Sequence, residues 1–283
     1  MKAEVYPYTE KIMKVQGRKP ASRNVVLVAF LLLPAVGLAP APAGEAASPE
    51  AESEAARVKE ILNKVDRLWR GSTSVGQMEM EVVTAHWSRT LRMKVYTEGM
   101  ERSLVRITYP AKEEGVATLK VDNNIWNYLP KIKRVTKVPA SMMLGSWMGS
   151  HFTNDDVVKD SQYVRDYDTK ITFEGERDGQ GILELTLYPK PEAPVVWGKI
   201  VSIIRAEDYI PVKMIYFDED GEQVRVMSFG EIKEMGGRTL PTVLMMRPLD
   251  KPEEYTRVTY LEITFDVDLK PDLFSLRSLQ KTR

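Results

Sequence analysis

The chain of 283 residues contains no cysteine and only two histidines. The missing cysteine excludes a disulfide framework, a thiol nucleophile and the acylated cysteine of a lipoprotein, and it fits an oxidising or a reducing compartment equally well. His86 and His151 are far apart in the sequence, and the spacing of His151 to Asp155 and Asp156 matches no metal motif. We therefore expect neither a metal site nor a cofactor.

The usual catalytic motifs are also missing. There is no G-x-S-x-G elbow, no G-x-G-x-x-G loop and no phosphate-binding loop. Neighbouring acids such as Glu207 and Asp208 would point to opposite faces of a strand, and Asp218–Asp220 reads as a turn, so neither forms a facing carboxylate pair. We predict that the protein is not an enzyme; a hydrolase is the disfavoured alternative, which an esterase and glycosidase screen would test.

The N-terminus has the features of an export signal. A basic stretch at 18–23 precedes an apolar run of about 15 residues, Val25–Ala39, which is shorter than the ~20 residues of a spanning helix. Small residues at Ala41–Ala43 follow as a cleavage site. We predict that residues 1–43 are a cleaved signal peptide and that the protein is periplasmic. An uncleaved membrane anchor is the alternative, and Met13 is an alternative start.

The charge balance excludes one class of partner. The whole chain has 40 basic and 40 acidic residues. The predicted leader holds six basic and two acidic residues, so the remainder carries a net charge near −4. This gives no general attraction to nucleic acid. We predict a linker at residues 44–54 and a single domain at residues 55–283.

Hydrophobic periodicity predicts one helix followed by many strands. Apolar residues recur at helical spacing in Ser53–Arg70, and a second, short helix is expected at Asn154–Lys159. Dipeptides such as Asp178-Gly179 mark tight hairpin turns. Period-2 alternation, which favours antiparallel pairing, predicts strands at 78–82, 91–95, 105–109, 115–121, 125–129, 133–138, 170–174, 182–188, 199–207, 212–218, 223–231, 239–246 and 256–268.

These elements predict a mainly β protein with few helices. A single curved antiparallel sheet of about 11–12 strands would form an incomplete, half-open β-barrel covered by the N-terminal helix and a lid segment. A barrel closed by its own side chains would leave the helix and the non-periodic segment at 140–152 without a surface to cover.

The segment at 140–152 is rich in methionine, tryptophan and glycine, a composition that suits an adaptable apolar contact surface. We interpret it as a movable lid over an apolar cavity; an ordinary loop packed on the core is the alternative. The predicted lid residues are Met142, Met143, Leu144, Trp147 and Met148. The predicted lining, inferred from the apolar face of each strand, is Met78, Met80, Leu91, Met93, Val105, Ile107, Trp126 and Tyr128.

A basic stretch lies between the aromatic strand and this lid. Lys131, Lys133 and Arg134 form a predicted basic rim that would meet lipid headgroups or an acidic partner. Lysine that guards an edge strand against aggregation is an equally good reading.

The same region resembles the LolA-like outer-membrane lipoprotein-sorting proteins. The shared motifs are W-x-Y-L-P at Trp126–Pro130, K-x-x-R at Lys131–Arg134 and M-G-S-x-F with a following acid at Met148–Asp155. The C-terminal Pro271–Arg277 is also similar, and the resemblance extends over residues 58–279. It implies a LolA/LolB-like half-barrel with a helical lid and an apolar cavity. In the well-studied carrier of this family an arginine near the cavity governs closure, and the motifs assign that role to no position here.

The resemblance implies a periplasmic, chaperone-like carrier that acts as a monomer. It would bind lipid or lipoprotein acyl chains and move them between membranes, with an inner-membrane lipid-exporting transporter and an outer-membrane acceptor as partners. The alternative is a lipid-sensing regulatory or accessory protein that binds lipid and a protein partner without moving cargo.

Overall fold

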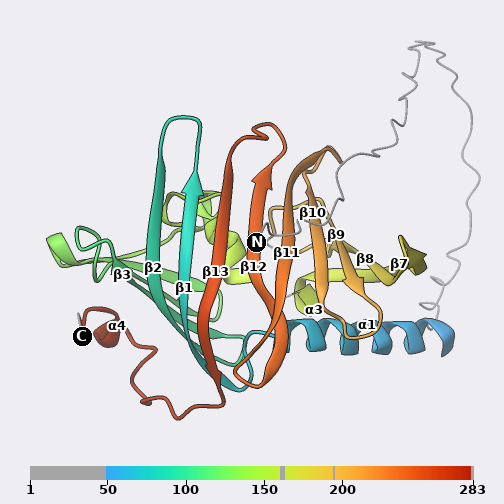
Figure 1. The fold of residues 1–283 in the computed structure, drawn as a ribbon, viewed down its shortest axis with the longest axis horizontal. Coiled ribbons are helices and arrows are strands. Elements are labelled where there is room, and N and C mark those ends of the chain that lie inside the picture. Colours follow the sequence, from blue (N-terminus) through green and yellow to red (C-terminus); the bar gives the residue numbers. More distant parts are fainter. Residues whose placement is uncertain (1–48, 160–162, 194, 282–283) are drawn as a thin grey trace, which may run out of the picture. The chain divides into compact units, whose positions relative to one another are not determined.

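The computed structural model describes residues 49–159, 163–193 and 195–281. The predicted signal peptide lies outside these residues. The described chain is dominated by one antiparallel sheet of 13 strands that is not closed into a barrel (Figure 1). This confirms the predicted fold class, with one or two strands more than the expected 11–12.

Every strand overlaps a range that alternation predicts. Their bounds are β1 Thr73–Val83, β2 Ser88–Glu98, β3 Arg102–Tyr109, β4 Ala117–Val121, β5 Asn124–Leu129, β6 Arg134–Lys137, β7 Tyr167–Arg177, β8 Gln180–Pro189, β9 Lys199–Arg205, β10 Pro211–Phe217, β11 Gln223–Met235, β12 Arg238–Pro248 and β13 Tyr255–Phe265. At the predicted β7–β8 turn, Asp178 and Gly179 have φ of 52° and 77°, as a two-residue hairpin with two left-handed positions requires.

The order of the strands requires a long connection across the sheet. It reads β6-β5-β4-β3-β2-β1-β13-β12-β11-β10-β9-β8-β7. The chain therefore enters the sheet at the central strand β1 and runs outward to the edge strand β6. It continues at the opposite edge strand β7 and returns to the centre at β13. The residues between these strands, 138–166, have to connect opposite edges of the sheet. We call them the crossing segment and describe residues 138–159 and 163–166 of it.

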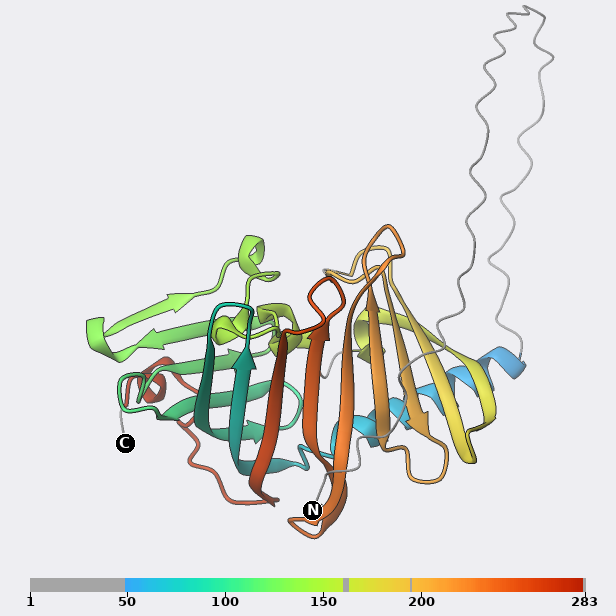
Figure 2. The same ribbon diagram turned by 45° about the horizontal axis from the view of Figure 1, so that its top comes forward.

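Helix α1 and the crossing segment cover one face of the sheet, which we call the inner face. Helix α1, Pro49–Arg67, packs Val58, Ile61 and Leu62 against buried side chains of β8–β12. The crossing segment contributes α2, Asn154–Lys159, α3, Tyr163–Asp166, and the 3-10 turns η2, Ala140–Met142, and η3, Trp147–Gly149. Figure 2 shows α1, in blue, running across the strands β7–β11.

The opposite face, which we call the outer face, is covered over strands β2–β6. The C-terminal segment after β13 packs Leu273, Phe274 and Leu279 onto this face. It ends in α4, Leu276–Leu279. Arg106 fixes this helix, because its guanidinium donates to the carbonyl of Ser278 at 3.1 Å. Burial lowers the pKa of Arg106.

Several expected boundaries need correction. Helix α1 begins at Pro49, inside the predicted linker at 44–54, and ends at Arg67 instead of Arg70. The short helix α2 has the predicted bounds. Helix α3 was not predicted, because four residues carry too little periodicity to recognise a helix.

Candidate functional site

The inner face contains a cavity of about 250 Å³ beneath the crossing segment. Its wall is made by strands from both halves of the sheet, by the end of α1 and by the crossing segment. Most of the wall is apolar, and its apolar residues are Val65, Trp69, Met78, Met93, Val95, Val105, Trp147, Phe152, Val157, Pro211, Met214, Met227, Phe229, Leu244, Val258 and Ile263. Such a wall can enclose hydrocarbon and offers few groups for bond chemistry.

One end of the cavity is more polar than the rest. Ser74, Thr97 and Ser103 lie in register on β1, β2 and β3 and line this end together with Asp66 and Arg70 of the chain around the end of α1. Ser74 and Thr97 satisfy each other through a hydroxyl–hydroxyl hydrogen bond of 2.6 Å. The hydroxyls of Ser74 and Thr97 are therefore buried as a hydrogen-bonded pair, which lowers the cost of their burial.

Trp147 closes the cavity from the crossing segment. Its side chain is 8% exposed and packs in one cluster with Met93, Val105 and neighbouring residues of β1–β3. The indole Nε1 donates to Thr118 Oγ1 at 3.1 Å. Thr118 in turn donates to Asn127 Oδ1 at 2.8 Å. The indole rings of Trp147 therefore pack on apolar side chains, and a hydrogen bond to Thr118 fixes them to the sheet.

A second anchor holds the backbone after Trp147. Met148 and Gly149 have φ of 51° and 68°, so the chain makes a left-handed turn that favours glycine at one of its positions. Arg89 of β2 donates from Nη2 to the Met148 carbonyl. A Cβ on Gly149 would lie 3.2 Å from the same nitrogen. Glycine at 149 thus permits the close approach of Arg89.

The strongest polar anchor joins α2 to β11. The guanidinium of Arg225, 5% exposed, donates from Nη1 to Asp156 Oδ2 at 2.8 Å and from Nη2 to the other carboxylate oxygen. Its carbon Cζ lies 4.0 Å from the ring centre of Trp197 and 4.2 Å from that of Tyr216. Burial lowers the pKa of Arg225, but the carboxylate of Asp156 outweighs it and raises the pKa overall. The pair is a fixed, buried charge contact.

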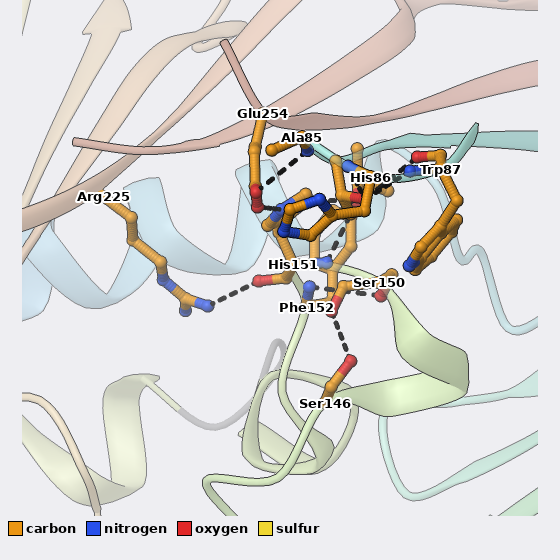
Figure 3. A network of polar contacts seen from close by, with 11 residues as sticks. Ala85, His86, Trp87, Ser146, Ser150, His151, Phe152, Arg225 and Glu254 are labelled. Carbon is orange, nitrogen blue, oxygen red and sulfur yellow. Dashed lines mark hydrogen bonds and ion pairs between the residues drawn. The ribbon is translucent and has the colours of Figure 1, made fainter. Parts of the chain in front are cut away.

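His151 forms a further anchor, to Glu254 in the loop between β12 and β13 and to Thr256 of β13. Its Nδ1 lies 2.8 Å from Thr256 Oγ1 and its Nε2 lies 3.1 Å from Glu254 Oε2. Figure 3 shows Glu254 next to the imidazole and to the amide of Ala85, and Arg225 reaching the carbonyl of His151. Hydrogen bonds from His151 and from the Ala85 amide hold the pKa of Glu254 below its ordinary value.

The start of α2 shows why the crossing segment folds locally in this way. Thr153 Oγ1 accepts from the amide of Asp156 at 3.1 Å, and Asp156 Oδ2 accepts from the amide of Thr153 at 2.7 Å. This reciprocal pair is a capping box. Thr153 therefore caps the helix. Asn154 instead donates to the carbonyls of Met142 and Gly145 at 3.0 and 3.1 Å.

Comparison with known proteins assigns the chain to a family. A family model described as an uncharacterized protein matches residues 99–281, which is more than half of the chain. The chain belongs to this family, and its fold is LolA-like. No curated protein matches the sequence.

Solved structures of three bacterial proteins carry the fold assignment. A domain from Vibrio parahaemolyticus assigned to outer membrane lipoprotein sorting has a TM-score of 0.71 at 20% identity, covering 81% of this chain and 99% of that one. A DUF1329 family protein from Desulfovibrio piger has a TM-score of 0.72 at 20% identity, with 80% and 99% covered. A LolA superfamily protein from Nitrosomonas europaea has a TM-score of 0.66 at 20% identity, with 78% and 98% covered.

The structure distributes the predicted lining residues over three places. In the LolA-like domain Met78, Met93 and Val105 are at the cavity wall. A second set packs in the cluster with Trp147, outside the set of wall residues: Met80, Leu91 and Ile107.

The aromatic pair of β5 lies elsewhere, and its assignment to the cavity needs correction. Trp126 and Tyr128 pack on the outer face with Leu119 of β4 and with Leu279. Asn127, the residue between them, is the one that reaches the inner face through Thr118. Side chains alternate between faces along a strand, and apolarity alone pointed to the wrong face because the C-terminal segment covers the outer one here.

The predicted lid residues share one segment but differ in burial. Trp147 lines the cavity, and Met148 packs against the same cluster. Met143 packs against Ile125 and Val158 next to it. Met142 and Leu144 are 57% and 62% exposed. The segment thus has a buried part that closes the cavity and an exposed apolar part.

Sequence reasoning missed the residues that anchor the crossing segment. Arg225 and Asp156 are 69 positions apart, and Arg89 and Met148 are 59 apart, so no local spacing links them. The one available signal for Asp156 was its place three residues after a threonine.

Two features are absent from the part of the chain that the structure describes. Among the described residues, no three His, Asp or Glu side chains gather as metal ligands would. No helix within residues 49–281, apart from the undescribed positions, has the length and apolarity needed to cross a membrane.

Proposed function

We propose that this protein is a non-enzymatic periplasmic carrier that takes up lipid or lipoprotein acyl chains in the inner-face cavity and moves them between membranes. The apolar cavity beneath a separately anchored crossing segment is the observation that supports this proposal. Hydrocarbon in such a wall is stabilised by about 25 cal/mol for each Å² removed from water, so one acyl chain gains several kcal/mol.

The size of the cavity points to a small payload in the closed state. Its volume of about 250 Å³ lies below the ~300–1,000 Å³ of common ligand sites. We therefore infer that a single chain is enclosed while the crossing segment is closed, and that larger cargo requires the segment to move. The methionines of the wall and of the segment suit such adjustment, because their side chains are unbranched and adaptable.

The anchors support a hinged closure. In the well-studied carrier of the LolA-like proteins an arginine near the cavity governs closure. Here Arg225 holds the crossing segment through the carboxylate of Asp156, and Arg89 holds it through the carbonyl of Met148. We assign the closure role to Arg225 because it is the more buried of the two and is paired with a carboxylate on α2. An inner-membrane transporter would supply cargo, and an outer-membrane acceptor would receive it.

The experiment is native mass spectrometry with lipid analysis on protein gently isolated from its own host. We expect bound lipid that dissociates on activation. Protein that carries no lipid, and that binds no fluorescent fatty acid after delipidation, would contradict the cavity assignment.

Transfer between vesicles separates the carrier from the lipid-sensing alternative. A carrier moves labelled lipid from donor to acceptor vesicles in amounts that grow with protein concentration. A regulatory protein binds lipid with the same cavity but moves none, and changes its affinity for a protein partner instead.

A further inference from the structure

The hairpin of β5 and β6 carries a charge pattern that the cavity does not explain. Residues 123–154 contain no aspartate or glutamate, yet they include Lys131, Lys133, Arg134 and Lys137. The hairpin lies at the edge of the sheet, and it is the light-green pair of strands that extends to the left in Figure 2. The charged residues of this hairpin are therefore all basic.

The tip of this hairpin also exposes aliphatic side chains. Pro130–Ile132 forms a 3-10 turn without buried residues, and Lys133 follows it in the left-handed conformation with φ of 51°. This turn leaves Ile132 62% exposed and Leu129 45% exposed, between cationic neighbours. Among the described residues, no carboxylate lies at ion-pair distance from Lys131, Lys133 or Arg134.

Two simpler readings explain only part of this pattern. Lysine that guards an edge strand belongs on the strand itself, which fits Arg134 and Lys137 of β6 but leaves an exposed isoleucine at the turn unexplained. A purely acidic protein surface would match the cations and would gain nothing specific from Ile132. A surface that is anionic outside and apolar just beneath it matches both.

We propose that the β5–β6 tip docks on anionic membranes, with Ile132 and Leu129 entering the boundary between headgroups and acyl chains and the three cations lying among the headgroups. Basic segments bind anionic leaflets by charge, and apolar side chains add affinity by entering the interface. This docking concerns a different surface from the cavity, so it can hold or fail independently of lipid carriage.

Vesicle flotation of the full chain tests the proposal. The probes are phosphatidylcholine vesicles with and without phosphatidylglycerol, each at low and high salt. We expect the protein to float with the anionic vesicles only, and less at high salt because surface charges are screened. Ile132→Asp and the triple variant Lys131→Gln/Lys133→Gln/Arg134→Gln should each lower the bound fraction by about tenfold.

Matched variants control for general effects of charge and polarity. Leu261→Asp changes another exposed aliphatic, on β13, and Lys112→Gln/Lys251→Gln/Arg257→Gln removes three exposed cations elsewhere. Both should float like the parent, and all variants should share its melting temperature. Equal binding to neutral vesicles, or no loss in either tip variant, would overturn the proposal. Loss in the charge variant alone would also overturn it, in favour of docking by charge without entry of Ile132 and Leu129 into the membrane.

Discussion

At the scale of single residues, Trp147 offers the most direct test of the cavity. Its rings pack on the inner-face cluster and its indole nitrogen bonds Thr118. Trp147→Asp places a charge against the apolar wall, which is unfavourable next to hydrocarbon. We expect the affinity for a fluorescent fatty acid to fall at least tenfold, as measured by titration, because even the lower end of the penalty for burying a polar group, about 2 kcal/mol, exceeds a factor of ten.

The conservative variant separates the two roles of this side chain. Trp147→Phe keeps the apolar plug and removes only the hydrogen bond, so it should bind the same probe within a few fold. Both proteins should keep the far-ultraviolet circular dichroism of the sheet, because the backbone ladder does not depend on this residue. An unchanged affinity for Trp147→Asp would remove Trp147 from the site.

Residue-scale reasoning from the sequence was reliable where burial has a single cause. Met93 lies on β2 between Arg92 and Lys94, which are both exposed, so alternation was enough to place it at the cavity wall. Trp126 and Tyr128 belong to a strand that is covered on both faces, by the crossing segment on one side and by the C-terminal segment on the other. Periodicity cannot choose between two covered faces, because that choice depends on segments more than a hundred residues away.

At the scale of elements, the attachment of α2 to β11 sets the strength of the closed state. Arg225 and Asp156 have side chains 6% and 13% exposed. Removing one partner of such a buried pair leaves an uncompensated charge and costs about 3–5 kcal/mol. We expect Arg225→Met to lower the free energy of unfolding by this amount, measured by urea denaturation, or to release the crossing segment without global unfolding, detected as local loss of hydrogen-exchange protection.

A surface pair of the same type provides the control. Arg92 and Glu79 form an ion pair with side chains 59% and 34% exposed, and Arg92→Met should change stability by less than about 1 kcal/mol. The double variant Arg225→Met/Asp156→Asn should recover much of the loss, because it leaves no lone buried charge and keeps a side-chain oxygen for the Thr153 amide. If Arg225→Met alters neither stability nor exchange, the pair does not hold the segment.

The elements themselves were largely predictable, and the contacts between them were not. Hairpins are encoded locally, by alternation and by turn dipeptides such as Asp178-Gly179. The pairing of β1 with β13 joins the two halves of the sheet through residues almost two hundred positions apart. No local pattern specifies this pairing. The non-periodic segment at 140–152 was recognisable from its composition, whereas the residues that hold it, Arg225 and Arg89, were not.

At the scale of the whole molecule, the proposed carriage of lipid requires the crossing segment to leave the inner face. The chain contains no cysteine, so an introduced pair would form the only disulfide. His151 and Thr256 suit this purpose, because the His151 amide donates to Thr256 Oγ1 at 3.0 Å and thus brings the two backbones close. In His151→Cys/Thr256→Cys the oxidised protein should bind lipid slowly and transfer little between vesicles, while the reduced form of the same variant should transfer normally. Each single variant, treated with the same oxidant, separates the effect of the cross-link from the loss of the native contacts. Equal transfer by the oxidised and reduced double variant would mean that cargo enters by another route, and the crossing segment would then be a fixed cover instead of a lid.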